Sequence, residues 1–269
     1  MTAPQLDFVP GTPRLAYEHV GRGPLVVFLH GIGGNRTNWR DQLAALADAY
    51  HAVALDDRGY GDSEDYAGPL AFEDFAADLL RVLDHLGAAQ AHLVGLSMGG
   101  RIVLDFYERH PERVASLVLC DAFPGFDAAT FPPAARAEFI RLRKEPLVNG
   151  KEPRDIAPTI ARTLMGPKAP ESVYERLIAS MGAVHKESYI KTVEATTLYE
   201  RVADLTTVKV PTQVIVGDED KLTPVAMSRR MAEAIPGARL DVIADAGHLS
   251  NIEQPAAFNA VLREFLDGL

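Results

Sequence analysis

The sequence predicts an α/β fold in which a mostly parallel sheet is flanked by helices and carries a helical cap insertion. Two observations lead to this expectation. Apolar runs of strand length alternate with longer helix-like stretches in the first half of the chain, and the same alternation returns near the C-terminus. Strands and helices that alternate in this way form mainly parallel sheets with helices on both faces.

Four apolar runs in the first half each end at glycine, proline or polar residues, as expected for strands buried on both faces. These runs are residues 25–29, 51–56, 91–96 and 113–121. The stretch 72–87 between them places its apolar side chains on one helical face. It ends at Gly87, and glycine is a common helix stop.

The alternation is interrupted between residues 123 and 205, where eight prolines separate short helix-like fragments such as 134–144 and 171–181. Strand, helix, strand and helix patterns then follow within 210–269. We therefore expect an α/β core made of residues 1–122 and 206–269. Residues 123–205 are expected to form a helical cap, or lid, over the carboxyl edge of the sheet.

Composition and charge exclude several classes of function. The 269 residues carry a formal net charge of −10 without any basic run, which argues against nucleic-acid binding and against anionic membrane surfaces. The longest apolar runs are too short to span a bilayer. The N-terminus does not read as a signal peptide, and the single Cys120 cannot form an internal disulfide, so a cytoplasmic location is expected.

The segment GLSMG, residues 95–99, is the first candidate catalytic motif, because it fits G-x-S-x-G between a predicted strand and a predicted helix. A serine in such a tight strand-to-helix turn has a strained backbone and needs small neighbours. Glycines two residues to either side supply this room. Ser97 is therefore the expected nucleophile.

The glycine-rich turn HGIGGN follows the first strongly apolar run and is the expected oxyanion hole. Its donors would be the backbone N–H groups of Ile32 and of Met98, the residue after the nucleophile. A dinucleotide-binding loop is the competing interpretation, but Arg36 occupies the third glycine position of G-x-G-x-x-G. His30 is expected to be structural.

Two loops after later strands supply the candidate acid and base. Asp220 follows one predicted strand, His248 follows the next, and the chain order Ser, Asp, His is that of α/β-hydrolases. His248 would accept the Ser97 proton while Asp220 fixes its tautomer. Asp121, at the end of the strand after the nucleophile helix, and Asp218 are alternative acids.

The remaining histidines are expected to have surface or core roles: His19, His51, His85, His92, His110 and His185. No metal-binding motif is present, since H-E-x-x-H, paired cysteines and histidine pairs at helical spacing are all missing. We expect neither a metal nor a cofactor, because acyl transfer to water requires none.

These motifs together resemble the α/β-hydrolase superfamily from about Pro24 to Leu266, which implies an eight-stranded type of sheet. Within it, the sequence is similar to 3-oxoadipate enol-lactonases in three stretches: GLSMGG, HKESYIKTVEA and IPGARLDVIADAGHLSNIEQPAAFNAVLREFL. The resemblance implies that the triad is Ser97, Asp220 and His248. It departs from those lactonases in one respect, because their early cap carries a tryptophan and the only tryptophan here is Trp39.

The expected function is hydrolysis of a small carboxylic ester or lactone by a serine esterase through an acyl-enzyme, with water as second substrate. Alternatives on the same fold are a cofactor-free perhydrolase or haloperoxidase, a carbon–carbon bond hydrolase, and a ligand receptor with slow turnover. The sequence does not distinguish a monomer from a dimer.

Overall fold

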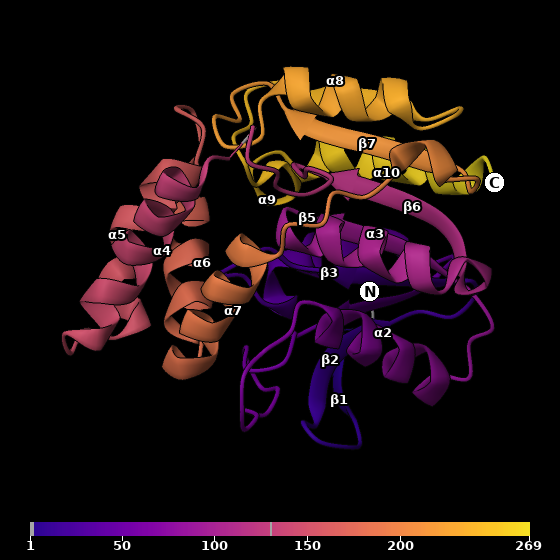
Figure 1. The fold of residues 1–269 in the computed structure, drawn as a ribbon. Coiled ribbons are helices and arrows are strands. Elements are labelled where there is room, and N and C mark those ends of the chain that lie inside the picture. The colour runs from indigo at the N-terminus through magenta and orange to yellow at the C-terminus, as the bar shows by residue number, and fades with distance from the viewer. Residues whose placement is uncertain (1–2, 130) are drawn as a thin grey trace.

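A computed structural model describes residues 3–129 and 131–269 and contains one eight-stranded sheet with the strand order β1-β2-β4-β3-β5-β6-β7-β8 (Figure 1). Strands β3 to β8 are parallel, whereas β2 is antiparallel to both β1 and β4. The predicted fold class is therefore confirmed. The strands are β1 (Gln5–Val9), β2 (Leu15–Val20), β3 (Leu25–Leu29), β4 (His51–Leu55), β5 (Ala91–Leu96), β6 (Val114–Cys120), β7 (Thr212–Gly217) and β8 (Arg239–Ile243).

Helices cover both faces of this sheet and bury two large apolar clusters against it. Helices α2, α3 and α8 contribute to one cluster, and α1, α9 and α10 contribute to the other. The alternation along β3 explains the arrangement, since Val27 and Leu29 join the first cluster while Val26 and Phe28 join the second. The core helices are α1 (Arg40–Leu46), α2 (Glu73–His85), α3 (Met98–Arg109), α8 (Val225–Ala234), α9 (Ser250–Glu253) and α10 (Pro255–Asp267).

Four further helices follow β6 in the chain and precede β7, and they lie beside the carboxyl ends of the strands (Figure 1). They are α4 (Pro133–Val148), α5 (Pro153–Leu164), α6 (Glu171–Gly182) and α7 (Lys186–Leu198). All four fall within the range 123–205 that the sequence analysis assigns to a cap. A small apolar cluster that includes Leu147, Ile156 and Val193 joins α4, α5 and α7, whereas Val173 and Leu177 of α6 belong to the second core cluster.

The prolines of this segment do not break it into short pieces, which corrects the expectation from the sequence. Pro133 and Pro153 each occupy the first turn of a helix, where the missing N–H has no partner to lose. Pro146 lies in the last turn of α4, and Pro158 lies within α5. The helices around them are 16 and 12 residues long.

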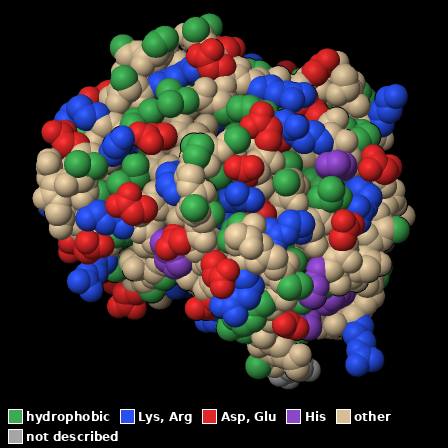
Figure 2. Space-filling view, turned by 60° about the horizontal axis from the view of Figure 1, so that its bottom comes forward, with side chains coloured by type: hydrophobic (Ala, Val, Ile, Leu, Met, Phe, Trp, Pro, Cys, Tyr) green, Lys and Arg blue, Asp and Glu red, His purple; other side chains and the backbone are tan. Residues whose placement is uncertain are grey.

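No helix of the described residues has the length and apolar character needed to cross a membrane. On the face shown in Figure 2, acidic and basic side chains alternate over the surface instead of gathering into large patches of one sign. Many of the acidic side chains take part in ion pairs, such as Asp48 with Arg263 and Glu138 with Arg141. On this face the negative charges are therefore interspersed with positive ones.

Candidate active site

Ser97 lies in a tight turn between β5 and α3, and its backbone has φ 54° and ψ −111°. Positive φ is rare for a residue with a side chain and is characteristic of strained functional turns. The two motif glycines make the turn possible. A Cβ on Gly95 would lie 2.3 Å from the carbonyl oxygen of Gly99, and one on Gly99 would lie 2.3 Å from that of Leu29.

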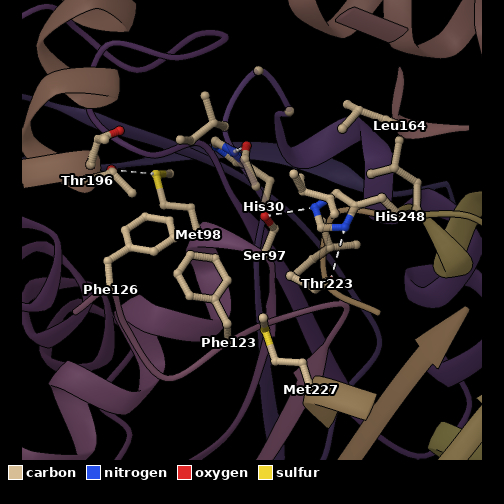
Figure 3. A pocket seen from close by; sticks show the side chains of 18 of the residues that line it. His30, Ser97, Met98, Phe123, Phe126, Leu164, Thr196, Thr223, Met227 and His248 are labelled. Carbon is tan, nitrogen blue, oxygen red and sulfur yellow. Dashed lines mark hydrogen bonds between the residues drawn. The ribbon is translucent and has the colours of Figure 1, made fainter. Parts of the chain in front are cut away.

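The side chains of Ser97, His248 and Asp220 form one hydrogen-bonded chain. Ser97 Oγ lies 2.9 Å from His248 Nε2 (Figure 3). His248 Nδ1 lies 2.9 Å from Asp220 Oδ2. Since a carboxylate only accepts, Nδ1 carries the proton and Nε2 is free to accept from the serine hydroxyl. The structure thus brings together the three residues that the sequence analysis singled out.

Thr223 completes the surroundings of Asp220, and the sequence analysis missed it. Its hydroxyl donates to Asp220 Oδ2 at 2.5 Å and lies 3.3 Å from His248 Nδ1. The N–H groups of Leu222 and Thr223 donate to Asp220 Oδ1. The spacing D-x-x-T in the loop DEDKLT is the local signal for this arrangement, because an Asp side chain readily accepts from N–H groups two and three residues later.

Neither of the alternative acids, Asp218 and Asp121, forms a hydrogen bond with the imidazole of His248. Asp218 is exposed and accepts from the N–H of Ala246. Asp121 is fully buried, but its carboxylate accepts from Gly217 and Ser250 instead of contacting the imidazole. The hydrogen bond to His248 Nδ1 therefore distinguishes Asp220 from both.

Burial acts to lower the pKa of His248, but the hydrogen bond and charge of Asp220, together with the charges of Asp121 and Glu253, outweigh it and raise the pKa above 6.5. Burial likewise acts to raise the pKa of Asp220. The hydrogen bonds from His248 and Thr223 and the charge of His248 reverse this effect, so its pKa lies below its usual value. The ionised acid and a readily protonated base thus stabilise each other.

Glu253 fixes the loop that carries His248, a role that the sequence analysis did not foresee. Its carboxylate accepts from the N–H groups of Gly166, Gly247 and Leu249. The N–H of His248 itself donates to the carbonyl of Leu164, at the end of α5. The base is therefore held from the core side and from the cap side.

The proposed oxyanion donors lie at the turn after β3 and at the start of α3. Neither the N–H of Ile32 nor that of Met98 donates to an acceptor among the described residues, and both residues line the same cavity as Ser97. His30 supports the first turn from behind, since its Nδ1 lies 2.8 Å from the carbonyl of Gly31 and its Nε2 accepts from the N–H of Asp57. These contacts agree with the expected structural role of His30.

Ser97 and His248 open into a cavity of about 520 Å³ between the sheet edge and the cap. Its walls are mainly apolar, with Phe123, Phe126 and Met227 grouped beside the serine (Figure 3). Trp39 lines the cavity from the core side, although it precedes the cap in sequence. A site of this size and composition suits a small organic molecule.

Among residues 3–129 and 131–269, no group of three or more His, Cys, Asp or Glu side chains is arranged to hold a metal ion. The buried Cys120 is a poor ligand or nucleophile, because burial and then the neighbouring Asp121 raise the pKa of its thiol.

A family model described as alpha/beta hydrolase fold matches residues 24–255. The chain is 31% identical to 3-oxoadipate enol-lactonase 2 of Acinetobacter baylyi, over 90% of each protein. It is 32% identical to a 2-hydroxy-6-oxononadienedioate/2-hydroxy-6-oxononatrienedioate hydrolase of Burkholderia vietnamiensis, over 94% of this chain and 91% of the relative. A solved structure of a thermophilic, malate-bound esterase from Thermogutta terrifontis superposes with a TM-score of 0.89 at 29% identity, covering 98% of both chains.

The pKa shifts generate a prediction that needs no substrate. In the wild-type protein, the imidazole of His248 should titrate above 6.5 in an NMR experiment. Asp220→Asn removes the negative charge that favours the imidazolium, so the titration midpoint should fall by roughly one pH unit or more. Asp218→Asn makes the same charge change on an exposed side chain of the same loop and should leave the midpoint in place. Equal shifts in both variants would contradict the assigned pairing.

Proposed function

Because the chain belongs to the α/β-hydrolase family, we propose that it is a serine hydrolase that cleaves a small carboxylic ester or lactone through an acyl-enzyme. The observation that carries the proposal is the continuous chain from Ser97 Oγ through His248 to Asp220, which opens into the apolar cavity. The cytoplasmic location expected from the N-terminal sequence remains a prediction.

In the proposed mechanism, His248 Nε2 takes the hydroxyl proton as Ser97 Oγ attacks the carbonyl carbon of the substrate. The N–H groups of Ile32 and Met98 stabilise the negative oxygen of the tetrahedral intermediate. The imidazolium then protonates the leaving oxygen, and Asp220 stabilises its positive charge. Water attacks the acyl-enzyme by the same steps and releases Ser97.

Arg143 on α4 indicates a preference among such substrates, because among the described residues it is the cation of the cap that lines the cavity. A second cation of the lining, Arg230 on α8, is exposed. Arg141 and Lys144, the neighbours of Arg143, pair with glutamates outside the cavity.

No carboxylate of the described residues lies within ion-pair distance of Arg143. Its guanidinium lies instead 3.5 Å above the ring of Phe139 and donates a long hydrogen bond, of 3.4 Å, to the carbonyl of the same residue. It also forms a hydrogen bond with the hydroxyl of Tyr189.

A guanidinium without a carboxylate partner in a mainly apolar cavity attracts an anion strongly, because little water screens the charge. Tyr189 lies beside it in the cavity wall, and the guanidinium acts against the burial that raises the pKa of this phenol. Asp127 also lines the cavity and accepts from the N–H of Ala129. The names of both curated relatives contain dicarboxylates, which supports a substrate with a free carboxylate.

Removal of the nucleophile tests the mechanism. Ser97→Ala should reduce the hydrolysis of p-nitrophenyl esters and lactones by roughly 10⁶-fold, leaving only what binding and the oxyanion hole supply. Circular dichroism should show an unchanged fold. Ser116→Ala, which truncates a buried serine on β6, is the matched control and should keep nearly full activity. A folded Ser97→Ala variant with more than about a tenth of the wild-type rate would refute the mechanism.

The dependence of kcat/KM on pH tests the base. His248 must be neutral to accept a proton, and its pKa is raised, so kcat/KM should increase with pH through an inflection above 6.5. A neutral ester is the substrate of choice, because its own ionisation does not enter the curve. A flat profile between mildly acidic and mildly alkaline pH, with the protein folded throughout, would exclude a histidine base.

Paired substrates test the role of Arg143. The wild-type enzyme should hydrolyse mono-p-nitrophenyl succinate with a higher kcat/KM than the neutral p-nitrophenyl butyrate. Arg143→Gln should lower kcat/KM for the anionic ester by roughly 10- to 100-fold, the range for losing a hydrogen bond to a charged group. Activity on the neutral ester should change little. An equal loss on both esters would mean that Arg143 shapes the cavity without recognising a carboxylate.

A further inference from the structure

Asp121 is a buried carboxylate that the proposed mechanism does not use. It directly follows β6, which lies in the sheet between β5, the strand that leads to Ser97, and β7, the strand that leads to Asp220. Its side chain has no exposed surface, and its backbone has a φ of 44°. Aspartate tolerates this left-handed conformation better than most residues with a side chain.

Cys120 and Asp121 form hydrogen bonds with the segments that carry all three triad residues. The carbonyl of Cys120 accepts from the N–H of Ser97 at 2.9 Å. The carboxylate of Asp121 accepts from the N–H of Gly217 at 2.8 Å, three residues before Asp220. It also accepts from the N–H of Ser250 at 3.2 Å and from its hydroxyl at 2.5 Å, two residues after His248.

The donors around Asp121 favour a carboxylate over a neutral side chain. Two of the three are backbone N–H groups, which cannot turn round to accept a hydrogen bond. An asparagine would fit the same backbone and still accept from Gly217, but its amide nitrogen would face the N–H of Ser250. No lysine or arginine of the described residues forms an ion pair with Asp121, and the charges that act on it most are that of Asp220 and then that of His248.

We propose that Asp121 is a positioning residue for the acid–base pair, tying the end of β7 to the start of α9 and, in its ionised form, adding a second negative charge that acts on the imidazole of His248. This inference rests on the proposed function, since it concerns how the same pair is held. In this arrangement the carboxylate favours the imidazolium that forms when Ser97 gives up its proton.

Three carboxylates from three elements act on His248: Asp220 in the loop after β7, Asp121 after β6, and Glu253 in α9. Asp121 joins the end of β7 to the start of α9 without belonging to either, since it accepts from Gly217 and from Ser250. Burial and then the charge of Asp220 raise the pKa of Asp121 to about 7, although His248, Ser250 and Gly217 act to lower it.

Asp121→Asn tests the proposal by two measurements on the full-length protein. The inflection in kcat/KM for a neutral ester should move to lower pH by roughly one unit, the ordinary spread of histidine pKa values among protein environments. The rate above the inflection should fall by roughly 10- to 100-fold through misplacement of the pair. This loss is far smaller than the roughly 10⁴-fold expected on removing the acid itself.

A direct NMR titration of the His248 imidazole should show the same downward shift and requires no turnover. It therefore tests the proposal even if the chain proves not to hydrolyse esters. Asp218→Asn is again the matched control for loss of one negative charge, and its midpoint should equal that of the wild type.

Ser250→Ala provides a second variant if Asp121→Asn does not fold. It removes one donor from the carboxylate and should move the midpoint of His248 in the same direction by a smaller amount. A wild-type midpoint in a folded Asp121→Asn protein would overturn the electrostatic part of the proposal. Wild-type rates in both variants would overturn the positioning part.

Discussion

The tight turn at Ser97 is the constraint on which the rest of the structure depends. Gly95 and Gly99 allow backbone to contact backbone where β5, α3 and the end of β3 meet, at separations that no side chain would permit. This contact directs the N-terminus of α3 toward the cavity, where its free N–H groups and dipole favour negative charge. It also places the turn after β3 beside the serine, since a Cβ on Gly31 would lie 3.1 Å from Ser97 Cβ.

The second constraint is the burial of charge around one imidazole. Asp220, Asp121 and Glu253 are each at least 95% buried, and each receives several N–H or O–H donors that offset the loss of water. The same burial strengthens every interaction with His248. A raised pKa makes the imidazole a stronger base but lowers the fraction of it that is neutral at a given pH. The three carboxylates therefore affect both the strength of the base and the amount of it that is ready to accept a proton.

Local patterns were sufficient to predict β3 to β8, because these strands end at clear turn signals and β3 to β7 are almost entirely buried. They were insufficient for β1 and β2. Strand β2 contains Glu18, which is buried only because Arg36 and Arg40 pair with it from about 20 residues away. The same limit applies within the site. Ser97, Asp220 and His248 stand in recognisable motifs, whereas the contacts of Asp121 and Glu253 join segments that are distant in sequence.

Arg143 illustrates the limit most clearly, because the cap contains several cations at similar spacing and nothing in the sequence distinguishes the one that faces the cavity. Its environment depends on how α4 packs against α7, which the fold alone determines.

The cap is also hydrogen-bonded to the loop of His248, since the N–H of His248 donates to the carbonyl of Leu164 at the end of α5. A molecule that fills the cavity therefore touches helices that determine its fit and, through one hydrogen bond, the loop that holds the base. We therefore expect substitutions in α5 that shift Leu164 to affect kcat as well as KM.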